Sequence, residues 1–207
     1  MTWRLPDALQ TADDNAAVGL LTRYFGRPYL SPGCADGAYF DSWATESDPF
    51  RFTADDLIAI KFLSVEAPKT AVRELLRDRA DEFSNLLINL GTDRDLACEQ
   101  QPLDDGWAGW PLMRQLRGIP GIGTTTASKL LARKRPRLRP IWDVVVAAVT
   151  DTVATQWEPL REALRADECA LHHRLLRLRD QAGLPDSVSA LRVLDVIAWR
   201  EGKDRGL

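Results

Sequence analysis

A glycine-rich turn and one carboxylate are the residues of this sequence best suited to chemistry. Residues 118–124 read Gly-Ile-Pro-Gly-Ile-Gly-Thr, and Asp143 follows them after a Pro-containing basic stretch. Glycines permit positive φ and let another molecule approach the backbone closely. Free N–H groups at the start of the next helix, together with its dipole, favour a phosphate oxygen. The turn is therefore predicted to bind phosphate.

The charge around this turn points to the same kind of ligand. The chain carries a net charge of −3, yet residues 107–142 hold eight basic side chains and no acidic one. A local basic segment indicates a polyanionic partner even in an acidic protein. We expect duplex DNA to be held by its phosphate backbone, which positions a protein without specifying a base sequence. The predicted DNA-binding residues are Gly121, Gly123, Thr124, Thr125, Lys129, Arg133, Lys134 and Arg135.

Helices must position these residues, because apolar residues recur with a period near 3.6 along most of the chain. The predicted fold is all-α, with helical lobes around the turn. The predicted helices cover Asp14–Phe25, 53–65, Thr70–Arg79, Asp81–Leu90, Trp107–Leu116, Thr124–Arg133, Asp143–Thr155, Pro159–Ala166, Glu168–Gln181 and Ser187–Trp199.

Two lobes are predicted along the chain. Residues 1–105 would form an N-terminal helical lobe, and residues 106–207 would hold the turn and the C-terminal helices. Residues 26–52 are rich in Gly, Pro and Asp but contain six aromatic side chains. Such a stretch is too apolar for a flexible linker, so it is predicted to be an ordered loop that packs on the body.

Several classes of protein are excluded by composition. The first residues lack the pattern of a signal peptide, and no apolar run approaches the roughly 20 residues needed to cross a bilayer. The three cysteines form no Cys-x-x-Cys pair, which argues against a disulfide framework and a cysteine-rich metal site. We therefore expect a cytoplasmic protein that needs no membrane, metal or cofactor.

The segment IPGIGTTTASKLL resembles the helix-hairpin-helix motif of DNA repair proteins. Over about residues 110–150, the hairpin, the following Pro-containing loop and Asp143 resemble the helix-hairpin-helix DNA glycosylase superfamily. This resemblance implies that Asp143 stabilises the oxocarbenium ion or activates a water while an N-glycosidic bond breaks. Trp142 or Trp110 would stack on the flipped base. Thr125 occupies the position of the Schiff-base lysine of bifunctional members, which implies a monofunctional enzyme.

A wider resemblance, carried by TADDLIAIKFLSV and LLARKRPRLRPIWDVVV, is to an uncharacterised bacterial domain family of unknown function. It brings no activity with it. Asp143 also has a purely structural interpretation, because Asp is a preferred N-cap and a helix is predicted to follow it. The alternative hypothesis is therefore a non-catalytic DNA-binding or protein-interaction module in which Asp143 only caps a helix.

Overall fold

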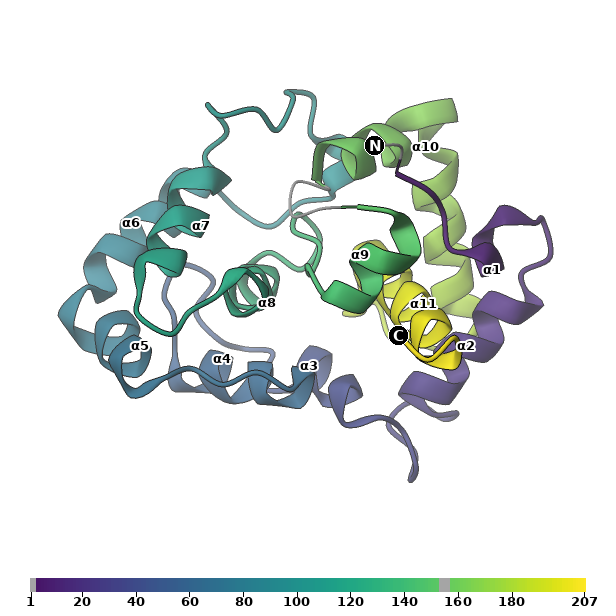
Figure 1. The fold of residues 1–207 in the computed structure, drawn as a ribbon, viewed down its shortest axis with the longest axis horizontal. Coiled ribbons are helices and arrows are strands. Elements are labelled where there is room, and N and C mark those ends of the chain that lie inside the picture. Colours follow the sequence, from purple (N-terminus) through teal and green to yellow (C-terminus); the bar gives the residue numbers. More distant parts are fainter. Residues whose placement is uncertain (1–2, 153–156) are drawn as a thin grey trace.

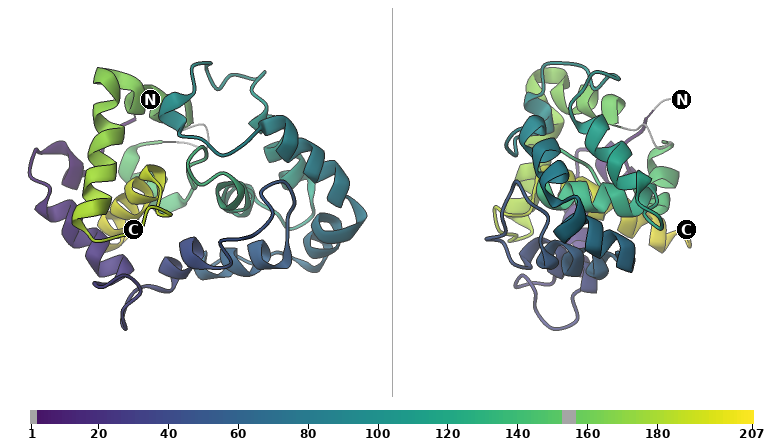
Figure 2. Two further views of the ribbon diagram at one scale, coloured as in Figure 1. Left: turned by 180° about the vertical axis from the view of Figure 1, so that it is seen from behind. Right: turned by 90° about the vertical axis from the view of Figure 1, so that its left-hand side faces the viewer.

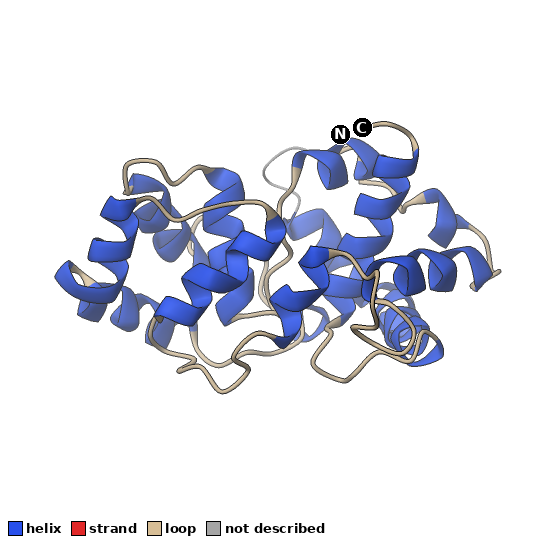
Figure 3. Ribbon diagram, turned by 90° about the horizontal axis from the view of Figure 1, so that it is seen from below, coloured by secondary structure: helices blue, strands red, loops and turns tan. Residues whose placement is uncertain are grey.

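The computed structural model describes residues 3–152 and 157–207. All regular elements in these ranges are helical, and Figure 3 shows no strand among them. The predicted all-α fold is confirmed. The α-helices are α1 (Asp7–Gln10), α2 (Asn15–Phe25), α3 (Tyr39–Ser42), α4 (Ala54–Ala59), α5 (Lys69–Arg73), α6 (Ala80–Leu90), α7 (Gly109–Gly118), α8 (Thr124–Lys134), α9 (Val144–Thr150), α10 (Trp157–Gln181) and α11 (Ala190–Asp204). The shorter segments are the 3-10 turns η1 (Asp36–Ala38), η2 (Ile60–Leu63) and η4 (Leu96–Cys98), and the π-helical turn η3 (Glu74–Asp78).

Local signals in the sequence explain where these helices begin and end. Thr53 and Asp56 form a reciprocal capping box at the start of α4. Gly91 ends α6 with a φ of +84°, which favours glycine. Helical geometry is interrupted inside α10 at Ala166–Cys169, where two separate helices were predicted. The helix predicted over Asp143–Thr155 is observed as α9, and residues 153–155 of that prediction lie outside the described part of the chain.

The helices pack in two groups that do not follow the order of the chain (Figures 1 and 2). In the first group, α11 packs against α1, α2, α9 and α10. In the second group, α8 packs against α4, η2 and α7, and α7 packs against α6. The boundary predicted between residues 105 and 106 does not separate these groups, because the first draws helices from both ends of the chain.

One continuous hydrophobic core runs through both groups. It includes Phe25 of α2, Leu112 of α7, Leu130 of α8 and Ile197 of α11, all fully buried. The aromatic loop, residues 26–52, packs on this core through Phe40 and other rings and contains η1 and α3. Among residues 3–152 and 157–207, no helix combines the length and apolar character that crossing a bilayer requires.

Candidate functional site

The glycine-rich turn forms a hairpin between α7 and α8, which we call the hairpin (residues 118–124). Ile119 and Ile122 are buried in the core and fix the turn between the two helices. The Ile122 N–H donates to the carbonyl oxygen of Ile119 at 3.0 Å, which closes the turn. Gly121 and Gly123 remain exposed, and Gly123 is the N-cap residue of α8. The two helices joined by a tight turn that the sequence predicts are therefore present.

The two glycines of the hairpin are needed for different reasons. Gly121 has a φ of +86°, and a Cβ there would lie 3.0 Å from Cγ of Pro68, so the fold itself requires glycine. Gly123 has a φ of −86°, and nothing lies within 4 Å of the place a Cβ would occupy. The fold has no steric need for glycine at position 123. A ligand that approaches the backbone closely from outside would instead explain why glycine occupies this position.

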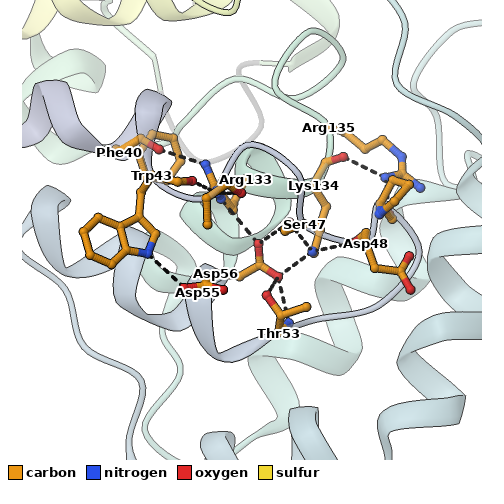
Figure 4. Close-up of polar contacts among 12 residues, drawn as sticks. Phe40, Trp43, Ser47, Asp48, Thr53, Asp55, Asp56, Arg133, Lys134 and Arg135 are labelled. Atoms are coloured by element: carbon orange, nitrogen blue, oxygen red, sulfur yellow. Dashed lines mark hydrogen bonds and ion pairs between the residues drawn. The ribbon is translucent and has the colours of Figure 1, made fainter.

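The basic side chains that follow the hairpin are mostly buried, contrary to expectation. Figure 4 shows the polar contacts that Arg133 and Lys134 make. Lys134 and Arg135 lie in the interior, and the side chain of Arg133 is only 8% exposed. Arg135 donates to the carbonyl oxygens of Gly91 at 2.6 Å, Pro49 at 2.7 Å and Leu87 at 2.9 Å. The prediction that Lys134 and Arg135 follow a DNA backbone is wrong, because their donors are turned inward and satisfied by the protein.

Arg133 and Lys134 hold the aromatic loop against α4 through one buried carboxylate. Both pair with Asp56, with Nε of Arg133 3.3 Å from Oδ1. Arg133 also donates to the carbonyl oxygens of Phe40 and Trp43, and Lys134 donates to that of Asp48 at 2.7 Å. These contacts give Arg133 a structural role as well (Figure 4).

Exposed cations near the hairpin come instead from α7 and from the start of α5. Arg114 and Arg117 lie on the outer face of α7, opposite the buried Leu112 and Leu116. Lys69 follows Pro68, the residue that contacts Gly121. Within the described residues, none of these three cations makes an ion pair. Sequence reasoning did not single out these three cations, although the helical period of α7 places Arg114 and Arg117 on its polar face.

Asp143 caps α9 and also faces a second charged group. Its Oδ1 accepts from the N–H of Val145 at 2.9 Å, as an N-cap does. Its Oδ2 lies 3.6 Å from Nζ of Lys129, which is itself buried and donates to the carbonyl oxygen of Leu63 at 2.8 Å. Burial lowers the pKa of Lys129, and the charge of Asp143 opposes that shift. Lys129 is therefore a partner of Asp143 inside the protein, and its predicted place on a DNA-facing surface is wrong.

A cavity of about 410 Å³ opens beside Asp143, where the two helix groups meet. This volume lies in the range of roughly 300–1,000 Å³ that is usual for small-molecule sites. Polar side chains on its wall are Asp36, Ser64, Thr125, Lys129, Asp143, Arg192, Asp195 and Lys203. Its aromatic side chains are Tyr24, Phe62 and Trp199.

The predicted stacking residues do not line this cavity. Trp110 stacks on Trp157 with ring centroids 4.4 Å apart, and with Trp107 these rings surround the buried guanidinium of Arg139. Trp142 exchanges backbone hydrogen bonds with the hydroxyl of Ser128. Neither tryptophan is therefore placed to stack on a base in this cavity. Phe62 and Trp199 were missed because they lie far from the hairpin in sequence.

Arg192 of α11 organises the inner wall of the cavity. Its Nε donates to Asp41 at 2.9 Å, and it forms an ion pair with Asp195. Its remaining contacts go to the hydroxyl of Tyr24 and the carbonyl oxygen of Gly37, both at 2.9 Å. Burial raises the pKa of Asp41 and raises that of Asp195 to about 6, while the charge of Arg192 opposes both shifts. One cation is thus shared by two buried carboxyl groups.

A comparison with family models finds a family of unknown function, DUF6308, over residues 17–202. The chain belongs to this family. No curated protein and no solved structure matches it. The part that matches DUF6308 includes the hairpin, Asp143 and the whole cavity wall except Lys203. Within the described residues of this DUF6308 chain, no three His, Cys, Asp or Glu side chains are grouped so as to hold a metal ion.

Proposed function

We propose that this protein grips duplex DNA at the hairpin and hydrolyses the N-glycosidic bond of an extruded nucleotide in the cavity, using Asp143. The observation that carries the proposal is the position of Asp143. Its carboxylate is fixed by the N-cap bond to Val145, and it lies on the wall of a cavity that also presents aromatic rings. A base taken out of the stack needs such a pocket, with rings to stack on and polar groups beside them.

The DNA-binding half of the proposal is supported by the hairpin rather than by the basic segment. Gly123 leaves the backbone at the start of α8 open, and α8 directs its first N–H groups outward at that end. Arg114, Arg117 and Lys69 add exposed positive charge around it. Contacts of this kind bind phosphates and not base edges, so the protein would hold DNA without sequence preference.

The chemistry of the proposal follows from the fixed carboxylate. Positive charge develops on the sugar as the bond to the base breaks, and an anion held nearby stabilises that charge without reorganising. Lys129 pairs with Asp143 and helps to hold its carboxylate in place. Thr125, on the same wall, stands where the resembled family carries its Schiff-base lysine in bifunctional members. The proposed enzyme therefore releases a base by hydrolysis.

The test compares Asp143→Asn with the wild type on duplexes that each contain one damaged base. Asn caps helices about as well as Asp, so this variant should fold normally while losing the charge. Asp151→Asn is the matched control, because Asp151 is exposed at the other end of α9 in a left-handed conformation that Asn accepts. We expect base release by the wild type and by Asp151→Asn, and loss of it in Asp143→Asn.

Two outcomes would contradict the proposal in different ways. If the wild type binds DNA but releases no base from any duplex, the protein is a DNA-binding module and Asp143 is only a cap. If fluorescence anisotropy finds no binding to duplex DNA at low salt, a role in protein interaction replaces both DNA hypotheses.

A further inference from the structure

A buried carboxyl group from α11 also lies on the wall of the same cavity. Asp195 of α11 lines it together with Asp143 and Lys129. Its side chain is almost fully buried, with 8% of its surface exposed. Besides Asp36, the cavity thus presents two carboxyl groups whose surroundings differ. Asp143 accepts from a backbone N–H and lies beside a lysine, whereas Asp195 is paired with Arg192.

Arg192 cannot fully neutralise both of its acidic partners. Its single positive charge is shared between Asp41 and Asp195, and both are withdrawn from water. Asp143 adds a further negative charge that acts on Asp195, while Lys129 acts in the opposite direction. Burial is the largest cause of the raised pKa of Asp195, about 6. The groups that face Asp195 are Arg192 on α11, Tyr24 on α2, Asp41 on α3, Lys129 on α8, Arg139 before α9 and Asp143 at its N-cap.

We propose that Asp195 is the proton donor of this cavity and protonates the departing base while Asp143 acts on the sugar. This inference rests on the proposed glycosylase function and deepens it. Asp195 is suited to the role because it lines the cavity, is buried, shares the single charge of Arg192 with Asp41, and is oriented by its contact with Arg192. Pairs of carboxyl groups whose surroundings separate their protonation states divide acid and base roles in this way.

Water is the only co-reactant that the step needs. The C1′–N bond breaks, and its electron pair stays with the base, which takes the proton of the Asp195 carboxyl group. Water adds to C1′ and gives its proton to Asp143. The products are the free base and an abasic sugar, with Asp195 ionised beside Arg192 and Asp143 protonated. Transfer of a proton from Asp143 through solvent to Asp195 restores the starting state.

The inference also names a substrate class. A neutral base is a poor leaving group until a ring nitrogen or carbonyl oxygen is protonated. A base that already carries a positive charge, such as 7-methylguanine, leaves without this help. A cavity with its own proton donor is therefore suited to neutral damaged bases.

The experiment uses the full chain and duplexes containing one hypoxanthine, uracil or 8-oxoguanine, with 7-methylguanine as the cationic comparison. We expect the wild type to release at least one neutral base, with a rate that falls as the pH rises above about 6. This direction follows because Asp195 must be protonated to act, and its pKa is raised to about 6. Asp195→Asn should slow that reaction by about 100-fold or more, and any release of 7-methylguanine should be spared.

Three results would overturn the inference, and they are distinguishable. Equal release of the neutral base by Asp195→Asn and the wild type removes the role of Asp195 alone. Release of 7-methylguanine and of no neutral base leaves the proposed function standing but refutes the proton donor. Release of no base at all refutes the proposed function and this inference with it.

A second measurement keeps the inference testable if Asp195→Asn does not fold. Carbon-13 NMR of labelled aspartate carboxyl groups in the wild type should show one buried group that titrates near pH 6. Asp41→Asn should lower that titration point, because Arg192 would then be paired with Asp195 alone. An Asp195 that stays ionised down to about pH 4 would overturn the assignment.

Discussion

Replacing Asp56 with alanine should destabilise the protein strongly, although Asp56 takes no part in the proposed chemistry. Its carboxylate is fully buried and pairs with Arg133 and Lys134, whose side chains are 8% and 1% exposed. Loss of one partner of a buried ion pair costs about 3–5 kcal/mol, because the other charge is left unpaired. The N–H of Thr53, 2.8 Å from Oδ2 of Asp56, also loses its acceptor, which adds about 1 kcal/mol for the lost cap.

The sum is on the order of 5 kcal/mol, a large part of the roughly 5–15 kcal/mol that stabilises most proteins. Urea denaturation followed by circular dichroism measures it, with an expected fall in the midpoint of about 2 M or more. Asp81→Ala is the matched control: Asp81 lies in the first turn of α6, pairs with Arg51 and is 89% exposed, so its loss should cost at most about 1 kcal/mol.

The double variant Asp56→Ala with Lys134→Met separates the charge from the packing. Because the methionine leaves no unpaired ammonium, the double variant should be less destabilised than the two single variants added together. If Asp56→Ala lost less than about 1 kcal/mol, or if the two changes were additive, the buried cluster would not fix the aromatic loop. The basic segment would then be free to serve another role.

Two further predictions concern the hairpin. Gly123→Ala should lose about 1 kcal/mol of stability or less, because alanine is a poorer N-cap than glycine, but it should bind duplex DNA more weakly. Gly121→Ala should be destabilised by its φ of +86° and by the contact of the new Cβ with Pro68. Thermal melts and fluorescence anisotropy distinguish the two variants, and equal DNA affinity of Gly123→Ala and wild type would contradict the geometry. Arg117→Gln should reduce the slope of log affinity against log salt concentration by about 0.9. Lys129→Met should leave that slope unchanged because Lys129 is buried. The reverse pattern would indicate that Lys129, and not Arg117, contacts DNA phosphate.

Local features of the structure could be predicted from the sequence. The hairpin, the start of α8 and the N-cap of α9 depend on neighbouring residues, such as Gly121, Ile122 and Asp143, whose preferences are strong. The helical ranges follow from the period of apolar residues in the same way. These features needed no knowledge of distant partners.

Features that depend on distant partners could not be predicted. Lys134 and Arg135 look like surface cations, and only the folded chain brings Asp56, the carbonyl oxygen of Gly91 and those of the aromatic loop against them. The cavity likewise joins Phe62 of η2 to Trp199 of α11. A run of basic residues indicates a polyanionic ligand only when the fold leaves those side chains exposed to solvent.

The pairing of α2 with α11 has a consequence for how this chain emerges from the ribosome. α2 packs against α1, η1 and α10 as well as α11, but because α11 begins at Ala190, the apolar face of α2 is not fully covered until nearly all of the described chain has been translated. The group built from α4, α6, α7 and α8 meets its own partners much earlier. Nascent chains that stop before Ala190 should therefore be folded around the hairpin yet still recruit chaperones through α2.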